Sequence, residues 1–273
     1  MFAALGRLPN APLAYVVAQV SFEPFLEIEK HIPALQSSLR VQYPRYQRTE
    51  QVAFQVLPRP KPQPPQLQPV SLTNWEFGSI SNRTSVTIQQ NSLMLQATEY
   101  ETYEIFGQIW REIMQQVGEQ IPNLLTNRIG LRYIDFILPS SGETPEDYIA
   151  DRLRCDPEPG LSYQKPRGLT LVEYQLEHGM LMVRCWREIG RPALPPDLAA
   201  SPVLEPSIIT QRAVAPDQPT SVLDIDRSMP LSMTYDAGTL AEGFERLHKD
   251  VQVVFKALTT DHARTVWSGD PPA

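Results

Sequence analysis

A chain of 273 residues, 42% of them hydrophobic, can bury a full core as one large domain or as two closely packed halves. The formal net charge of −7 argues against bulk electrostatic capture of DNA or of an anionic membrane, although it permits a local basic patch. No segment reaches the apolar length of a transmembrane helix, and two cysteines suit a reducing compartment better than a disulfide scaffold. These features predict a cytoplasmic protein that does not enter a membrane.

The residue types that hold metals and phosphates lack the usual spacing. Cys155 and Cys185 are far apart, and no C-x-x-C or H-x-x-x-H pattern occurs. Glycine is scarce, and neither a G-x-G-x-x-G nor a G-x-x-x-x-G-K loop is present. We therefore expect no metal and no cofactor.

Apolar periodicity and turn residues predict the elements of the chain in order. In the first half they are a strand at 12–22, a helix at 24–39 that is kinked or divided at Pro33, and strands at 49–57, 73–80, 84–90 and 92–98. A helix then begins at the capping box of Thr98 and Glu101 and buries Ile105, Ile109, Ile113 and Val117. In the second half they are a central strand at 126–139, a short helix capped by Thr144, strands at 168–176, 180–187, 207–214 and 221–228, and a last long helix from Thr239.

The order is strand, helix, four strands and helix, followed by the same series again. It predicts an α+β fold of two β-α-β4-α-like halves, 1–125 and 126–273, packed as one compact unit. Antiparallel sheets would hold the long helices, in an arrangement that resembles TBP-like and helix-grip folds.

Two proline-rich passages, 57–69 and 191–206, are predicted to be long loops. Their proline density favours extended polyproline II geometry and removes backbone donors. Such passages serve either as recognition elements or as stiff spacers, and the sequence does not separate the two roles.

The central strand carries charges among large apolar residues. Strand alternation places Tyr133 and Asp135 on one face and Arg132 on the other. Each face then mixes a charge with apolar groups, and a charge in such a place needs a partner.

The strand at 221–228 offers two carboxylates, Asp224 and Asp226, on one face about 7 Å apart by strand rise. Such a pair can bind a divalent cation or share acid and base roles, but pairing with the central arginines is the simpler account. His248, beside the apolar stripe of the last helix, is either a hydrogen-bonded boundary histidine or a general base. We expect Asp224, Asp226 and Arg132 to form a buried network beneath that helix. The full set of candidate network residues is Arg132, Asp135, Asp224, Asp226 and His248.

The segment 40–61 combines basic and aromatic residues with a single acid, Glu50. It is a candidate surface for nucleic acid or for an acidic partner, and a solvated surface explains it equally well. Its candidate contact residues are Arg40, Tyr43, Arg45, Tyr46, Arg48, Arg59 and Lys61.

Several of these motifs also carry a family resemblance. The motifs are Pro12–Phe22, Gly130-Leu-Arg-Tyr-Ile-Asp135, Leu223-Asp-Ile-Asp226, Leu247-His248 with Phe255, and the ending Thr260-Asp-His-Ala-Arg-Thr-Val-Trp267. In their order and spacing they resemble a sporadically distributed family of bacterial proteins of about this length. The resemblance implies no catalytic residues, and the patchy occurrence implies a mobile or defence-type gene neighbourhood.

Three functions are consistent with the sequence. The first is a non-enzymatic interaction protein of bacterial origin, an accessory of a defence or mobile-element system whose protein partner is encoded nearby. The second is a nucleic-acid-binding protein that uses 40–61 and a curved sheet. The third is a small-ligand-binding protein or a hydrolase that uses Asp224, Asp226 and His248. The absence of a recognisable nucleophile favours a protein that is not an enzyme.

Overall fold

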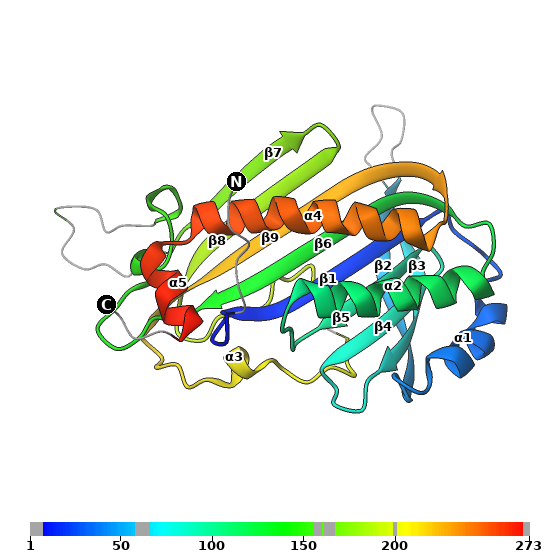
Figure 1. The fold of residues 1–273 in the computed structure, drawn as a ribbon, viewed down its shortest axis with the longest axis horizontal. Coiled ribbons are helices and arrows are strands. Elements are labelled where there is room, and N and C mark those ends of the chain that lie inside the picture. Colours follow the sequence, from blue (N-terminus) through cyan, green and yellow to red (C-terminus); the bar gives the residue numbers. More distant parts are fainter. Residues whose placement is uncertain (1–7, 58–65, 155–159, 161–166, 199–200, 270–273) are drawn as a thin grey trace.

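A computed structural model of the protein describes residues 8–57, 66–154, 160, 167–198 and 201–269. The fold is α+β, with a single antiparallel sheet and its two long helices packed on one face (Figure 1). The strands are β1 (Leu13–Phe22), β2 (Arg45–Leu57), β3 (Gln66–Gly78), β4 (Thr84–Gln89), β5 (Ser92–Ala97), β6 (Leu125–Ile137), β7 (Leu169–Leu176), β8 (Gly179–Ile189) and β9 (Pro219–Thr234). The helices are α1 (Ile32–Leu39), α2 (Tyr103–Gln120), α3 (Ile208–Gln211), α4 (Ala237–Leu258) and α5 (Asp261–Ser268).

The strands pair in the order β2-β3-β4-β5-β1-β6-β9-β8-β7. The pairing of β1 with β6 joins segments on either side of residue 125, with Val16 opposite Tyr133 and Val17 opposite Arg132. On its other side β6 pairs with β9, which places Asp226 opposite Arg132. The strands with the candidate charges therefore lie side by side near the middle of the sheet.

The two faces of the sheet are covered differently. On one face α2 and α4 pack against each other, and α4 crosses β6 and β9 (Figure 1). Apolar residues of β1, β6 and β9 form a large core with these helices. On the other face a smaller core joins Tyr15, Ile134 and Phe136 to Leu194, Leu198 and other residues of the 190–212 segment, which includes α3. We call these the helix face and the loop face.

The prediction of two β-α-β4-α halves is wrong. All nine strands of the described residues belong to one continuous sheet. Between β6 and β7 the described residues form two short 3-10 turns, Pro145–Asp147 and Asp151–Leu153, where the second half was expected to have a helix. The predicted strand at 207–214 is also wrong, because Ser207 caps a turn of helix there by accepting a hydrogen bond from the Thr210 amide. The sequence beyond it then forms one long strand, β9.

The start and inner face of α2 also differ from the prediction. Thr102, not Thr98, caps the helix by accepting a hydrogen bond from the Ile105 amide. Of the predicted inner face, Ile113 and Val117 are buried, but Ile105 is 48% exposed, and Phe106 and Trp110 are buried in the first half of the helix. Thr98 instead follows β5 directly and its amide donates to Arg83.

Other local predictions are confirmed. The segment around Pro33 divides into a 3-10 turn, Ile28–His31, and α1. Thr144 and Asp147 form a capping box with Pro145 in the first turn. The predicted loop at 57–69 is wrong at its ends, because Leu57 belongs to β2 and 66–69 belong to β3, where Leu57 pairs with Gln66 in a hairpin. Residues 58–65 lie outside the described residues.

Across the described part of the chain, helices that combine the length and the hydropathy needed to cross a membrane are absent.

Candidate functional site

The candidate network residues divide between the two faces of the sheet. Tyr133 and Asp135 point to the helix face, where His248 of α4 lies, while Arg132 points to the loop face. Asp224 and Asp226 of β9 lie with Arg132. Arg132, Asp224 and Asp226 do lie together in one polar network, but its predicted place beneath the last helix is wrong, because strand alternation sends the three side chains to the opposite side of the sheet. The structure does not bring Asp224 and Asp226 together with His248.

On the loop face, Arg132 and Asp224 form a bidentate ion pair. Nε and Nη2 of Arg132 each donate to one Asp224 carboxylate oxygen, both at 2.8 Å. Nη1 of Arg132 donates to Asp197 at 2.7 Å, from the proline-rich loop. Burial alone would lower the pKa of Arg132, but the hydrogen bonds to Asp224 and Asp197 raise it above its usual value.

A second arginine completes this arginine–aspartate cluster, which consists of Arg132, Arg184, Asp197, Asp224 and Asp226. Nε of Arg184 lies 3.3 Å from Asp224, and its Nη2 lies 3.6 Å from Asp226. Burial raises the pKa of Asp226, and the nearby arginines oppose that shift. The cluster supplies each buried carboxylate with a cation, as expected of a structural network. In the described portion of the chain, no group of three or more His, Cys, Asp or Glu side chains could hold a metal ion.

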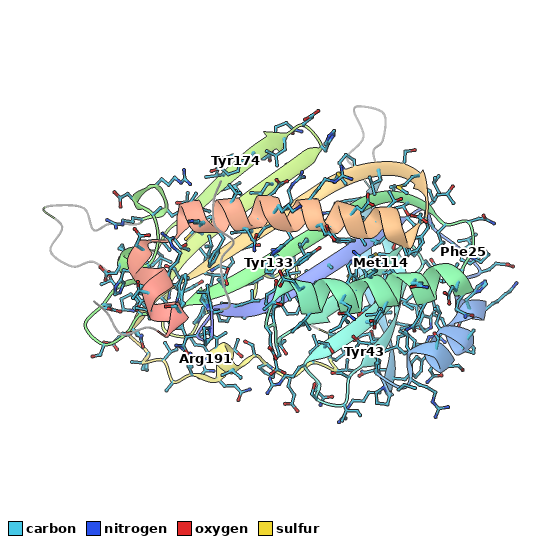
Figure 2. The ribbon with its side chains drawn as sticks, viewed as in Figure 1. Phe25, Tyr43, Met114, Tyr133, Tyr174 and Arg191 are labelled. Atoms are coloured by element: carbon cyan, nitrogen blue, oxygen red, sulfur yellow. The ribbon has the colours of Figure 1, made fainter. Side chains whose placement is uncertain are left out.

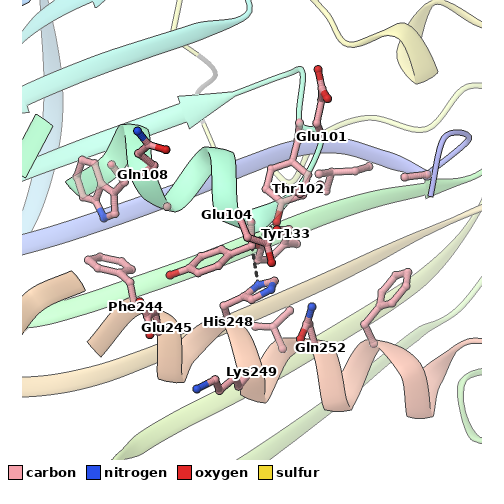
Figure 3. Close-up of a pocket in the computed structure, with 18 of the residues that line it drawn as sticks. Glu101, Thr102, Glu104, Gln108, Tyr133, Phe244, Glu245, His248, Lys249 and Gln252 are labelled. Atoms are coloured by element: carbon pink, nitrogen blue, oxygen red, sulfur yellow. Dashed lines mark hydrogen bonds between the residues drawn. The ribbon is translucent and has the colours of Figure 1, made fainter. Parts of the chain in front are cut away.

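On the helix face, a cavity of about 810 Å³ lies between α2, α4 and β6 (Figure 3). We call it the helix-side cavity. The segment 100–102 and residues of 8–13 close one end of it. Its aromatic lining consists of Tyr100, Tyr103, Trp110, Tyr133, Phe244 and Phe255. Its charged or titratable lining consists of Glu101, Glu104, Arg111, Asp135, Glu245, His248 and Lys249.

A chain of polar contacts connects the sheet and the two helices inside this cavity. The hydroxyl of Tyr133 lies 3.2 Å from the hydroxyl of Tyr100 and 3.2 Å from Nδ1 of His248. The ring of Tyr103 stacks on the imidazole of His248, with centroids 3.9 Å apart and planes 5° apart. Figure 3 shows His248 reaching from α4 toward Tyr133, and Figure 2 shows Tyr133 on the sheet between the two helices.

Burial keeps these groups uncharged. It lowers the pKa of His248 to about 4, so the imidazole is neutral at pH 7. It raises the pKa values of Tyr100, Tyr103 and Tyr133 above their ordinary value, so the phenols keep their protons. A neutral imidazole between phenol groups can donate or accept one hydrogen bond, and it can pass a proton to a bound molecule.

Asp135 differs from every acid of the arginine–aspartate cluster. It is only 4% exposed, it lines the cavity, and among the described residues its carboxyl group has no ion-pair partner. Burial, with a smaller contribution from the charge of Asp224 across the sheet, raises its pKa to about 8. Nε1 of Trp110, also in the cavity lining, is buried with no hydrogen-bond partner in the described structure. Asp135 therefore lines the cavity with no ion-pair partner in the described structure.

The 40–61 segment forms a less concentrated surface than its composition predicts. Arg40, Arg45 and Arg48 are exposed, and Arg48 is shared between Glu29 at 3.2 Å and Glu50 at 3.4 Å.

The two tyrosines of this segment separate. Tyr46 is exposed, but Tyr43 is buried in the core, which raises its pKa to about 12. Arg59 and Lys61 lie outside the described residues.

Sequence reasoning missed the part of the cavity that comes from α2 and the segment before it. Tyr100, Tyr103 and Glu104 belong to the run Glu-Tyr-Glu-Thr-Tyr-Glu at 99–104, whose alternation of acids and tyrosines was the available signal. Asp197 was also missed, because a single acid in a proline-rich loop has no pattern around it. In both cases the spacing of residues in the sequence does not show which side chains these residues contact in the fold.

Comparisons with protein-family models, with curated proteins and with solved structures find no significant match to the chain. The proposed function therefore depends on the geometry and chemistry of the cavity.

Proposed function

We propose that the protein binds a small organic molecule in the helix-side cavity. The observation that carries this proposal is a cavity of about 810 Å³ with an aromatic lining and a buried carboxyl group, that of Asp135, which has no ion-pair partner among the described residues. Pockets for drug-sized ligands range from roughly 300 to 1,000 Å³ and combine apolar walls with a few polar groups that fix the ligand. The cavity has both properties.

The elements around the cavity support a binding site and not a defect in packing. Side chains that line open space lose packing contacts on that side, at a cost in stability. The walls of the cavity nevertheless include ordered contacts, such as the stacking of Tyr103 on His248 and the edge-to-face pair of Trp110 and Phe244. These contacts hold the lining in place around open space.

Binding of the neutral fluorescent probe N-phenyl-1-naphthylamine tests the proposal. We expect its fluorescence to rise with saturation at one site per chain. Tyr103→Ala removes one wall and should weaken binding by about tenfold, the effect of about 1.4 kcal/mol of lost contact. Tyr46→Ala is the matched control, because Tyr46 is an exposed tyrosine of β2 outside the cavity. Absence of binding, or equal binding by both variants, would refute the proposal.

Association with a protein partner is a second candidate, favoured by the edge strand β7. In the described sheet β7 pairs only with β8, and its outer face exposes Leu169 (66%) and Leu171 (58%). Such an edge can accept a strand from another chain. The double variant Leu169→Lys, Leu171→Lys should lose any stoichiometric partner recovered from native cells. Recovery of the same partner by this variant would contradict this use of β7.

A further inference from the structure

The buried acids of the central strands have opposite electrostatic environments. Asp224 receives two hydrogen bonds from Arg132 and lies 3.3 Å from Arg184. Asp135, on the adjacent strand but on the other face, receives no cation from the described residues and faces open space. A buried acid without a counter-ion is costly, and it is rare outside functional sites.

The charged groups around Asp135 leave the cavity with an excess of acids. The groups that face the cavity are Tyr133 from β6, Tyr100 and Glu101 from the segment before α2, Tyr103, Glu104 and Arg111 from α2, and Glu245, His248 and Lys249 from α4; Asp224 acts on Asp135 through the sheet. The described lining residues of 8–13 are the apolar residues Leu8, Ala11, Pro12 and Leu13.

The two cations among these groups are not partners for Asp135. Nη2 of Arg111 lies 3.2 Å from Glu245, so this charge is already paired at the surface. Lys249 is exposed on α4, and His248 is neutral at pH 7. Among the described lining residues, Asp135 is therefore a buried acid without a cation of the protein as its partner.

Aromatic rings complete this environment. Tyr100 meets Tyr133 edge to face with centroids 5.7 Å apart, and Trp110 meets Phe244 at 5.6 Å. The face of an aromatic ring attracts a cation, and the attraction is strongest where water is excluded. Aromatic walls beside a carboxyl group are the combination that recognises ammonium groups.

We propose that the ligand of the helix-side cavity is an organic cation, an amine or quaternary ammonium with an apolar body, and that Asp135 is its counter-ion. This inference rests on the proposed ligand-binding function of the cavity. The ammonium group takes the place of the missing counter-charge, and the apolar body lies against the aromatic walls. Glu104, which is exposed on the lining, adds to the attraction of a cation.

The proposal predicts a definite coupling between binding and protons. With its pKa at about 8, Asp135 is mostly protonated at pH 7 in the empty protein. A cation binds the carboxylate better than the acid, so binding should release a proton at pH 7. Affinity for a ligand of fixed charge should rise about tenfold per pH unit up to pH 8 and then level off. His248 and the cavity tyrosines do not titrate between pH 6 and pH 9, because burial shifts their pKa values away from that range.

Benzyltrimethylammonium and its neutral carbon isostere, neopentylbenzene, form the test pair. They have nearly the same shape, and the charge of the first does not depend on pH. We expect the wild-type chain to bind the cation at least about tenfold more tightly than the isostere at pH 8.5, as measured by displacement of N-phenyl-1-naphthylamine or by calorimetry. Asp135→Asn should abolish both this preference and the pH dependence.

The controls separate this inference from the proposed function. Asp217→Asn makes the same substitution at an exposed site outside the cavity and should leave the preference unchanged. Dye binding by Asp135→Asn shows that the variant keeps its cavity. Equal affinity for the two probes, or a preference that survives in Asp135→Asn, overturns the cation inference while dye binding still supports a ligand cavity. Absence of dye binding by the wild type overturns both the cation inference and the proposed ligand-binding function.

Discussion

Removal of Asp224 should destabilise the protein far more than removal of Asp197, although both acids bind the same arginine. Asp224 is fully buried and accepts two hydrogen bonds of 2.8 Å from Arg132. The Asp197 side chain is 58% exposed, although one of its oxygens lies only 2.7 Å from Arg132. The two substitutions therefore compare a buried pair with a surface pair on one guanidinium.

The magnitudes follow from burial. Asp224→Ala leaves Arg132 and Arg184 facing a buried hole, and loss of one partner from a buried pair costs about 3–5 kcal/mol. For a chain of this size that corresponds to a fall in Tm of about 10 °C. Asp197→Ala should cost about 0–1 kcal/mol, as for other solvent-exposed pairs.

Urea denaturation and calorimetry at pH 7 measure both variants. Asp224→Asn serves as a third variant, since it keeps the volume of the side chain and removes only its charge. An Asp224→Ala protein that melts like the wild type, or no worse than Asp197→Ala, would show that the cluster does not stabilise the fold in the way its geometry implies.

Three further predictions concern titration and the backbone. Asp135 should make the protein less stable as pH rises from about 4 to 8, because the pKa of its carboxyl group is 3.8 in the unfolded chain and about 8 in the folded chain. By linkage, the free energy of unfolding should fall by on the order of 4 kcal/mol between pH 4 and 7, and urea denaturation of Asp135→Asn should not show this fall. The imidazole of His248 should show no NMR titration above pH 5, because burial lowers its pKa to about 4. This lowered pKa should also reduce the stability of the protein as pH falls from 6.5 toward 4. An imidazole signal that titrates near 6.5 and is absent from His248→Gln would contradict this prediction. Gly179→Ala should lower the free energy of unfolding by at least about 3 kcal/mol, because a Cβ would lie 2.2 Å from the Ser228 carbonyl oxygen. Gly142→Ala, also at positive φ but with nothing within 4 Å of its Cβ, should lower it by only about 1 kcal/mol. Equal melting temperatures of the two variants would contradict the steric reasoning.

Local patterns in the sequence predicted the elements that depend on local interactions. The period of α4 and the β7–β8 hairpin both follow from neighbouring residues, and both are present. Alternation along β6 also placed Arg132 and Asp135 on opposite faces. These are features in which the side-chain spacing and the backbone period agree.

The features that depend on distant partners were not predictable in the same way. Periodicity does not show whether nine strands join one sheet or two, because edge pairing is settled by contacts far apart in the chain. It also did not show which face α4 covers, so the acids of β9 were assigned to the wrong side. The start of α2 was missed because Thr98 and Thr102 both offer a cap, and only the burial of Phe106 and Trp110 favours the second.

The contrast between Arg132 and Asp135 connects the stability of the protein with its proposed function. Both charges lie on β6, three residues apart, and both are nearly inaccessible to water. Arg132 has two carboxylate partners, one of them from a loop that folds over that face. The cations in the lining of the helix-side cavity, Arg111 and Lys249, are exposed, and neither forms an ion pair with Asp135. A core shaped by stability alone would hold an apolar residue or an asparagine at position 135, because an acid there is penalised at neutral pH. A protein tolerates such a local cost where a ligand removes it, and a cation in the helix-side cavity would convert the penalty at Asp135 into binding free energy.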